Sequence, residues 1–197
     1  QRQSEAMLAR RAQELTALHQ TTLDLNGELE LSALLRLIIH RACQLIGTDY
    51  GTMFMLTPDQ QALEIVALCN YPEELHLGNR LKKDQGLAGQ VFTTGKPLAV
   101  SDYKNWAGRM GNTTVQNMGR AMAVPLCQGE KVVGSLNVSD DVVGEFASNS
   151  MQLLEMFAAY ASVVIANAQL FAAEQRQRQT AETLREIGRL VGASLEL

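Results

Sequence analysis

Apolar residues recur every three or four positions over both ends of the chain, which is the spacing of helices that pack against other helices. The first such stretch covers residues 4–26 and ends at Asn26-Gly27, where both residues tolerate the left-handed backbone of a helix end. A second helix is predicted for residues 29–46. From residue 148 to about residue 187 the chain has no Pro, Gly or turn cluster, so we predict one long helix there.

The length of this last helix indicates how the chain is divided. At about 1.5 Å per residue the helix is about 60 Å long, whereas a compact domain of this size has a radius of gyration of about 15 Å. Much of the helix is therefore expected to leave the globular part. We expect a folded domain at residues 29–172, an N-terminal linker helix at residues 1–28, and a C-terminal linker helix at residues 173–197 that runs into the next module.

The apolar positions of the two end helices also predict a homodimer, because they form heptad seams that one sheet cannot cover. The seam of the last helix becomes polar at Glu174 and Gln177 and is mostly apolar again from Ala181. The predicted dimer contacts are Leu15, Leu18, Leu25, Tyr160, Val163, Asn167 and Leu170.

Between the end helices the pattern alternates with a period of two, which is typical of strands. A turn at Pro58-Asp59 joins the first two runs, and residues 128–130 join the last two as a hairpin. A short helix is expected at residues 86–94. Hairpins combined with flanking helices predict an α+β fold. The expected strands are residues 50–57, 62–68, 98–100, 121–127 and 131–139.

Three motifs make residues 31–171 resemble a GAF domain. A Gly-Leu-Ala-Gly run at residues 86–89 opens a helix that Thr94-Gly95-Lys96-Pro97 closes, as in that family. Residues 123–138 resemble its central hairpin, and residues 146–168 resemble its closing helix. The resemblance implies a six-stranded antiparallel sheet with helices on both faces. It also implies a sensory or dimerising role inside an intracellular signalling protein, such as a histidine kinase of a two-component system or a nucleotide cyclase.

The departures from the family are informative about cofactors. GAF domains with a bilin usually attach it through a Cys in the region of residues 106–118, and this chain has no Cys there. A haem site would need a His in the same loop, and this loop has none. Asn79-Arg80 and Asp140-Asp141 match the signature of the cyclic-nucleotide-binding members only loosely, and Cys43 and Cys127 do not match the cysteines of the sulfoxide reductases. We therefore expect no bilin, no haem and no methionine sulfoxide reductase activity.

Composition restricts the partners. The net charge of −4 gives no cationic surplus for nucleic acid. The three cysteines form no paired spacing, which favours a reducing compartment, and no uninterrupted apolar run approaches the roughly 18 residues of a membrane span. We expect a cytoplasmic protein without direct membrane contact in this segment. Its expected partners are a second copy and adjacent sensory or output domains of the same chain.

Catalytic and metal-binding patterns are missing from the sequence. No Ser, His and Asp set suggests a nucleophile, and the three histidines do not have the spacing of a helical metal site. We therefore expect no enzyme activity and no metal.

The methionines instead suggest an adaptable apolar pocket under residues 101–118, the longest stretch without clear periodicity. Arg120 stands at its mouth, where it could meet an anionic group. The same residues would also suit a flexible core under a mobile loop, so a sensory module with a ligand and a structural module without one both remain open. The candidate ligand-binding residues are Met53, Met55, Tyr103, Trp106, Met110, Met118, Arg120 and Met122.

Overall fold

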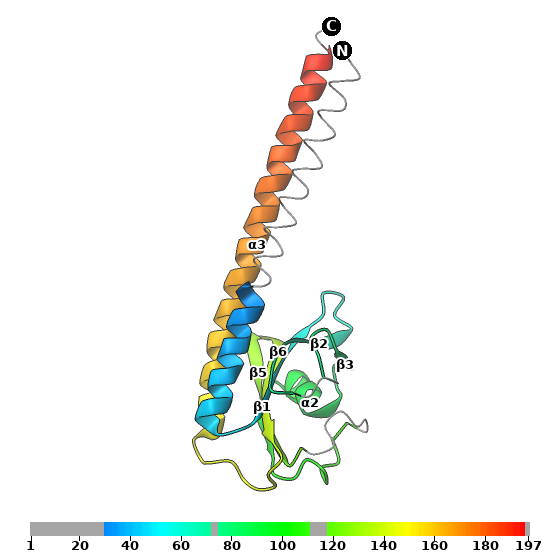
Figure 1. Cartoon of the computed structure of the whole chain (residues 1–197). Coiled ribbons are helices and arrows are strands. Elements are labelled where there is room, and N and C mark those ends of the chain that lie inside the picture. The colour runs from blue at the N-terminus through cyan, green and yellow to red at the C-terminus, as the bar shows by residue number, and fades with distance from the viewer. Residues whose placement is uncertain (1–29, 72–74, 111–117, 196–197) are drawn as a thin grey trace. The chain divides into compact units, whose positions relative to one another are not determined.

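The computed structural model describes residues 30–71, 75–110 and 118–195 (Figure 1). The expected helix at residues 4–26, with Leu15, Leu18 and Leu25 of the predicted seam, lies outside the described residues. Contacts divide the chain into two units, with the boundary after Val164. The unit Glu30–Val164 contains the sheet and the candidate site.

The centre of this unit is a six-stranded antiparallel sheet in the order β3-β2-β1-β6-β5-β4. Five strands lie where the alternating pattern predicts them. The sixth, β3, lies in a mostly polar stretch without an alternating pattern, so only the family resemblance implied a sixth strand. The strands are β1 (Tyr50–Leu56), β2 (Ala62–Cys69), β3 (Arg80–Lys82), β4 (Leu98–Val100), β5 (Arg120–Gln128) and β6 (Lys131–Asp140).

A helix at residues 30–46 covers one face of the sheet. The packing is so close that a Cβ added to Gly51 of β1 would lie 2.2 Å from the Ile39 side chain and 2.8 Å from the sulfur of Cys43. The start of α3 (Ser150–Leu195) packs on this face too, since the Ser162 hydroxyl accepts a hydrogen bond from the Cys127 amide at 3.1 Å. Only glycine fits at residue 51, so β1 is held directly under the helix.

Helix α2 (Gly86–Thr94) covers the opposite face of the sheet (Figure 1). It ends as predicted at Gly95, which has a left-handed φ of 65° and donates its amide to the Val91 carbonyl. Leu87 and Val91 pack against Ala121 and other apolar residues of the sheet. The predicted α+β fold, with helices on both faces of a six-stranded antiparallel sheet, is therefore confirmed.

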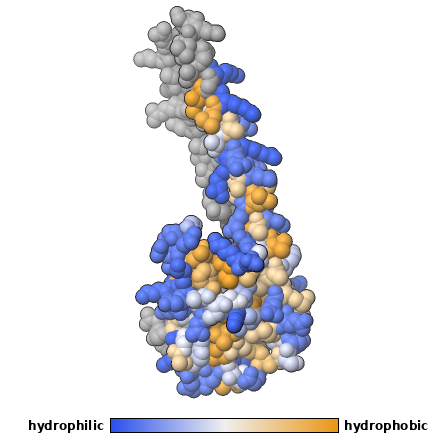
Figure 2. Space-filling view, turned by 180° about the vertical axis from the view of Figure 1, so that it is seen from behind, coloured by the Kyte–Doolittle hydropathy of each residue, from blue (hydrophilic) through white to orange (hydrophobic). Residues whose placement is uncertain are grey.

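Helix α3 continues without interruption past the unit boundary, as the absence of Pro and Gly predicts. Its seam residues Tyr160 and Val163 are each 56 % exposed and Leu170 is 62 % exposed. Asn167 is exposed as well. Figure 2 shows apolar side chains distributed among polar ones along this helix.

Among the described residues, the part of α3 at Ser150–Arg185 is long enough to cross a membrane, and it contains an 18-residue window with a mean hydropathy of 1.5. The sequence criterion of an uninterrupted apolar run did not detect it, because polar residues interrupt the stretch. Core helices of soluble proteins meet the same test. Leu154, Ala158 and Ala161 of this stretch are buried within the fold.

Candidate functional site

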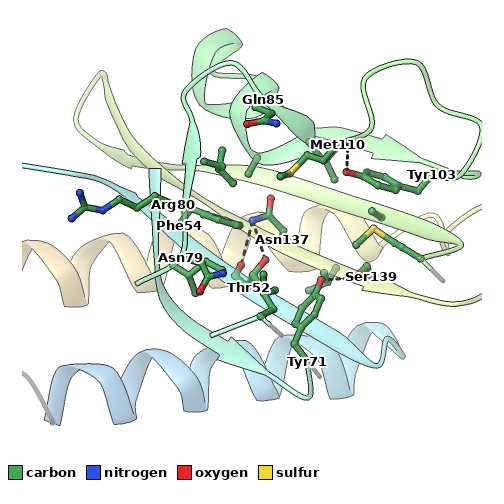
Figure 3. A pocket seen from close by; sticks show the side chains of 18 residues that line it. Thr52, Phe54, Tyr71, Asn79, Arg80, Gln85, Tyr103, Met110, Asn137 and Ser139 are labelled. Carbon is green, nitrogen blue, oxygen red and sulfur yellow. Dashed lines mark hydrogen bonds between the residues drawn. The ribbon is translucent and has the colours of Figure 1, made fainter. Parts of the chain in front are cut away.

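A cavity of about 250 Å³ lies between the sheet and α2. Its walls come from β1, β2, β3, β5 and β6, from the start of α2, and from the chain around Tyr71 and Tyr103 (Figure 3). The lining residues are Thr52, Phe54, Ile65, Tyr71, Leu75, Asn79, Arg80, Leu81, Gln85, Leu87, Ala88, Tyr103, Met110, Met118, Ala121, Asn137, Val138 and Ser139.

Strand register brings the polar part of this wall together. Thr52 of β1 pairs with Asn137 of β6, and Ala121 of β5 pairs with Ser139 of β6. Because successive side chains of a strand alternate between its faces, Asn137 and Ser139 point to the same side as Thr52 and Ala121. The pairing therefore places hydroxyl and amide groups on the floor of a cavity whose other walls are mostly apolar.

The part of the wall around Tyr103 depends on a glycine. Gly86 has a φ of 66°, and a Cβ added there would lie 2.9 Å from Cγ of Met110. The Met110 amide donates to the Tyr103 hydroxyl at 3.5 Å, and the Tyr103 and Trp106 rings are 5.5 Å apart between centroids. Trp106 therefore does not line the cavity itself but packs against the Tyr103 ring, which does.

Asn137 is the central polar group of the cavity and is 8 % exposed. Its amide nitrogen lies 3.4 Å from the Thr52 carbonyl, from the Thr52 hydroxyl and from the Ser135 hydroxyl. A carbonyl can only accept, so the NH₂ side of the amide must face Thr52. The oxygen then points away from Thr52, as Figure 3 shows.

The side-chain oxygens of Asn137 and Asn79 are both buried and have no hydrogen-bond partner. Three such oxygens occur among the described residues, and these two belong to residues that line the cavity. A buried acceptor without a partner costs about 1–3 kcal/mol. Two of them in one cavity indicate a place where a donor from another molecule would be stabilising.

The aromatic hydroxyls of the cavity stay neutral. The Tyr71 hydroxyl and the Ser139 hydroxyl are 2.9 Å apart, and burial raises the pKa of Tyr71 above its usual range. Burial also raises the pKa of Tyr103. Both phenols therefore remain protonated at neutral pH and can donate or accept hydrogen bonds.

The one charged lining residue described is Arg80, and Glu64 already neutralises it. Nε of Arg80 lies 2.6 Å from the Glu64 carboxylate, and the Arg80 side chain is 59 % exposed. The pair stands at the edge of the cavity, where water screens it. It supplies little electrostatic attraction for a charged ligand.

The sequence-predicted binding residues divide into two groups. Tyr103, Met110 and Met118 line the cavity, and Trp106 packs against its wall. Met53, Met55 and Met122 do not line it, because strand alternation turns them to the face that the helix at residues 30–46 covers. The prediction that these three methionines form the pocket wall needs this correction.

Arg120 also lies outside the cavity lining, contrary to the expectation that it would face a ligand. Its guanidinium binds the Asp140 carboxylate at 2.9–3.1 Å and donates to the Glu145 carbonyl at 2.6 Å. The guanidinium carbon lies 4.5 Å from the centre of the Phe146 ring. We call Arg120, Asp140, Glu145 and Phe146 the Arg120 cluster.

The sequence reading missed Thr52, Tyr71 and Asn137. A usable signal was the alternation of Ser135, Asn137 and Ser139 along a strand expected to be covered on both faces. Polar residues at such positions must be buried, and buried polar groups need partners. A polar row of this kind therefore indicates a cavity rather than a solvated face.

The cysteines lie away from the cavity. Cys43 of the helix at residues 30–46 and Cys69 of β2 are buried between that helix and the sheet, where His40 Nδ1 lies 3.4 Å from the Cys69 sulfur, and Cys127 is exposed. Burial raises the pKa of the Cys43 thiol to about 11. Within the described ranges no three His, Cys, Asp or Glu residues gather as a metal site.

Several solved structures are similar to this chain, all below 25 % identity. The GAF domain from a phosphoenolpyruvate-protein phosphotransferase of Coxiella burnetii has a TM-score of 0.68 at 20 % identity, covering 81 % of this chain and 96 % of that one. The free methionine-R-sulfoxide reductase from Neisseria meningitidis, solved with its substrate, has a TM-score of 0.62 at 15 % identity over 71 % of this chain and 80 % of that one. GAF-B of DevS from Mycobacterium smegmatis has a TM-score of 0.57 at 20 % identity, covering 75 % and 98 %. These likenesses agree on the fold, and the family model described as GAF domain matches residues 28–166, most of the sequence, so this chain belongs to the GAF domain family.

Proposed function

We propose that this GAF domain is a sensory module that holds a small molecule in the cavity and passes its bound state to α3. The observation that carries the proposal is the pair of buried, unpartnered amide oxygens of Asn79 and Asn137 in a mostly apolar cavity. A cavity that served only as packing would be more stable with apolar side chains at these positions. GAF domains are commonly small-molecule-binding sensory modules, which agrees with this assignment.

A continuous set of backbone contacts supports the relay. Met118 lines the cavity, and the next residue, Gly119, donates its amide to the Asp140 carbonyl at 2.8 Å and accepts a hydrogen bond from the Tyr103 amide at 2.7 Å. A Cβ added to Gly119 would lie 2.4 Å from the backbone of Val142. A shift of Met118 on binding would therefore press on the segment that leads from β6 to α3.

The Arg120 cluster fixes that same segment. Arg120 follows Gly119, and its guanidinium holds both the Asp140 carboxylate at the end of β6 and the Glu145 carbonyl beyond it. Asp140 also accepts the Val142 amide at 3.0 Å. Displacement of the cavity wall would be transmitted through this cluster to Ser150, the first residue of α3. Rigid, hydrogen-bonded segments of this kind carry small shifts over a distance.

The setting that we propose is a homodimeric, cytoplasmic signalling protein, of the histidine kinase, two-component or nucleotide cyclase type. In it α3 would continue as a coiled coil to adjacent sensory or output domains of the same chain. The apolar seam of α3 and the family's sensory role support this setting, and the negative net charge argues against nucleic acid as a partner.

We also propose that the module is not an enzyme. A reductase of the kind that shares this fold needs an accessible thiolate at its cavity, whereas Cys43 is 2 % exposed with a pKa that burial raises to about 11, and the exposed Cys127 does not line the cavity. Cys43 and Cys69 lie on the face of the sheet that the cavity does not use.

A purely structural dimerisation module is the second candidate, favoured by the exposed apolar seam residues Tyr160 and Val163. The two candidates differ in one observable. Native mass spectrometry of the chain purified from its own host should show a retained small molecule if the domain is a sensor. A bare protein mass, also after gentle purification, would favour the structural module.

Two variants locate the retained molecule. Ala88→Leu places three extra carbons into the cavity from α2 and should abolish retention. Gln90→Leu introduces the same side chain on the exposed side of the same helix and should retain the molecule. If both variants retain it equally, the molecule lies elsewhere and the cavity assignment is wrong.

A further inference from the structure

The cavity's polar groups also indicate the chemical class of the ligand. Resting on the proposed sensory function, we infer that the ligand is an uncharged, ring-shaped molecule with at least two N–H donors, such as an amide or an amino-substituted heterocycle, and that it carries no phosphate or carboxylate.

The requirement for hydrogen-bond donors on the ligand follows from the unpartnered side-chain oxygens of Asn79 and Asn137. Asn137 must keep its NH₂ side toward the Thr52 carbonyl, so the oxygen that it presents to the cavity can only accept. The Asn79 oxygen is likewise buried and unpartnered. A hydrogen on the ligand would satisfy each of these two oxygens, and N–H groups supply such hydrogens in fixed directions.

The exclusion of charge follows from the rest of the lining. Arg80 is the charged group among the described lining residues, and its Nε is 2.6 Å from Glu64. The Tyr71 and Tyr103 hydroxyls stay neutral because burial raises the pKa of each. An anionic ligand would lose its hydration without gaining an unpaired cation, which disfavours phosphates and carboxylates.

The preference for a ring follows from the apolar walls. Phe54, Tyr71 and Tyr103 bring three aromatic rings to the lining, and Met110 and Met118 add adaptable thioethers. The volume of about 250 Å³ suits one small ring system held against these walls. The ligand is therefore expected to resemble a free heterocycle more than a nucleotide.

The test uses two matched series of probes on the full chain. One consists of adenine, N6,N6,9-trimethyladenine and AMP, and the other of nicotinamide, N,N-dimethylnicotinamide and nicotinate. Binding is followed by NMR of ¹³C-labelled methionine methyl groups, because Met110 and Met118 line the cavity while Met53 and Met122 face the other side of the sheet. Shifts at the first pair without shifts at the second report occupancy of the cavity.

In at least one series, adenine or nicotinamide should bind about tenfold more tightly than both its methylated analogue and its anionic analogue. This ratio corresponds to about 1.4 kcal/mol, which is the contribution expected from one hydrogen bond. Asn137→Leu should remove the advantage over the methylated partner, and Asn79→Leu provides the same test if the first variant folds poorly. Equal binding within both series, preference for the anion, or no binding in either series would overturn this inference. A molecule retained in native mass spectrometry would still uphold the proposed sensory function, so the two can fail separately.

Discussion

Substituting Arg120 by Met should strongly destabilise the domain, because it leaves a buried carboxylate without its counter-ion. The Asp140 side chain is 3 % exposed and that of Arg120 is 17 % exposed, and three contacts of 2.9–3.1 Å join them. Removing one partner of a buried ion pair costs about 3–5 kcal/mol. Since the Val142 amide still donates to Asp140, we place the expected loss near the lower end, at about 3 kcal/mol.

The assay is urea unfolding followed by circular dichroism at pH 7. With a denaturant dependence of about 2 kcal/mol per molar urea, a loss of about 3 kcal/mol moves the unfolding midpoint down by about 1.5 M. The matched control is Arg80→Met, which breaks a pair whose side chains are 59 % and 31 % exposed and should cost at most about 1 kcal/mol.

A second control separates the charge from the packing. Arg120→Met combined with Asp140→Leu removes both charges, so it should be less damaging than Arg120→Met alone. If Arg120→Met lowers the midpoint no more than Arg80→Met does, the Arg120 cluster contributes no more than a surface pair. The assignment of that cluster as the fixed link between β6 and α3 would then be refuted.

Three further predictions concern other parts of the chain. Burial raises the pKa of the Cys43 thiol from 9.0 to about 11, so the folded form holds this proton more tightly and that contribution is complete below pH 9. As the pH rises from 9 to above 11, up to about 3 kcal/mol should be lost. Cys43→Ala should show a flatter pH dependence in urea titrations, and parallel curves would contradict this. Val163→Glu with Leu170→Glu should convert a homodimer to a monomer in light scattering, and a wild-type monomer would disprove the seam. Glu174→Leu with Gln177→Leu should raise the dimer's melting temperature and lock the output of the full-length protein, and an output that still switches would show that this stretch is only a spacer.

The sheet and its covering helices were largely predictable because their signals are local. The sequence located five strands, most of them by alternation, and the glycine turn at Gly95 fixed the end of α2 to the residue. The short strand β3 lies in a mostly polar stretch without alternation, and its pairing with β2 depends on contacts that the local sequence does not encode. Only the family resemblance anticipated it.

The cavity was predicted less well, because its position depends on which face of each strand points inward. Met53 and Met55 alternate as expected, but the sequence does not say which helix covers their face. A methionine in the core and one in a pocket wall have the same local pattern. Asn137 was overlooked for the converse reason, since a polar residue on a strand is ordinarily solvated.

Arg120 illustrates a third difficulty. Its position beside Gly119, at the edge of the irregular stretch, suggested a contact with an anionic ligand. The anion is instead supplied by Asp140, its direct cross-strand neighbour in the β5–β6 pairing. Strand register, which sets this pairing, becomes known only when the hairpin is built.

The central claim is that occupancy of the cavity alters the segment leading into α3, and hydrogen exchange of residues 141–149 tests it most directly. The Val142 amide is bonded to Asp140 and the Gly144 amide to the Ser101 carbonyl at 2.8 Å, so both report on this segment. Protein that retains its small molecule should exchange these amides several-fold more slowly than protein from which it has been removed, and Arg120→Met should abolish the difference. Equal exchange in the occupied and the emptied protein would contradict the account.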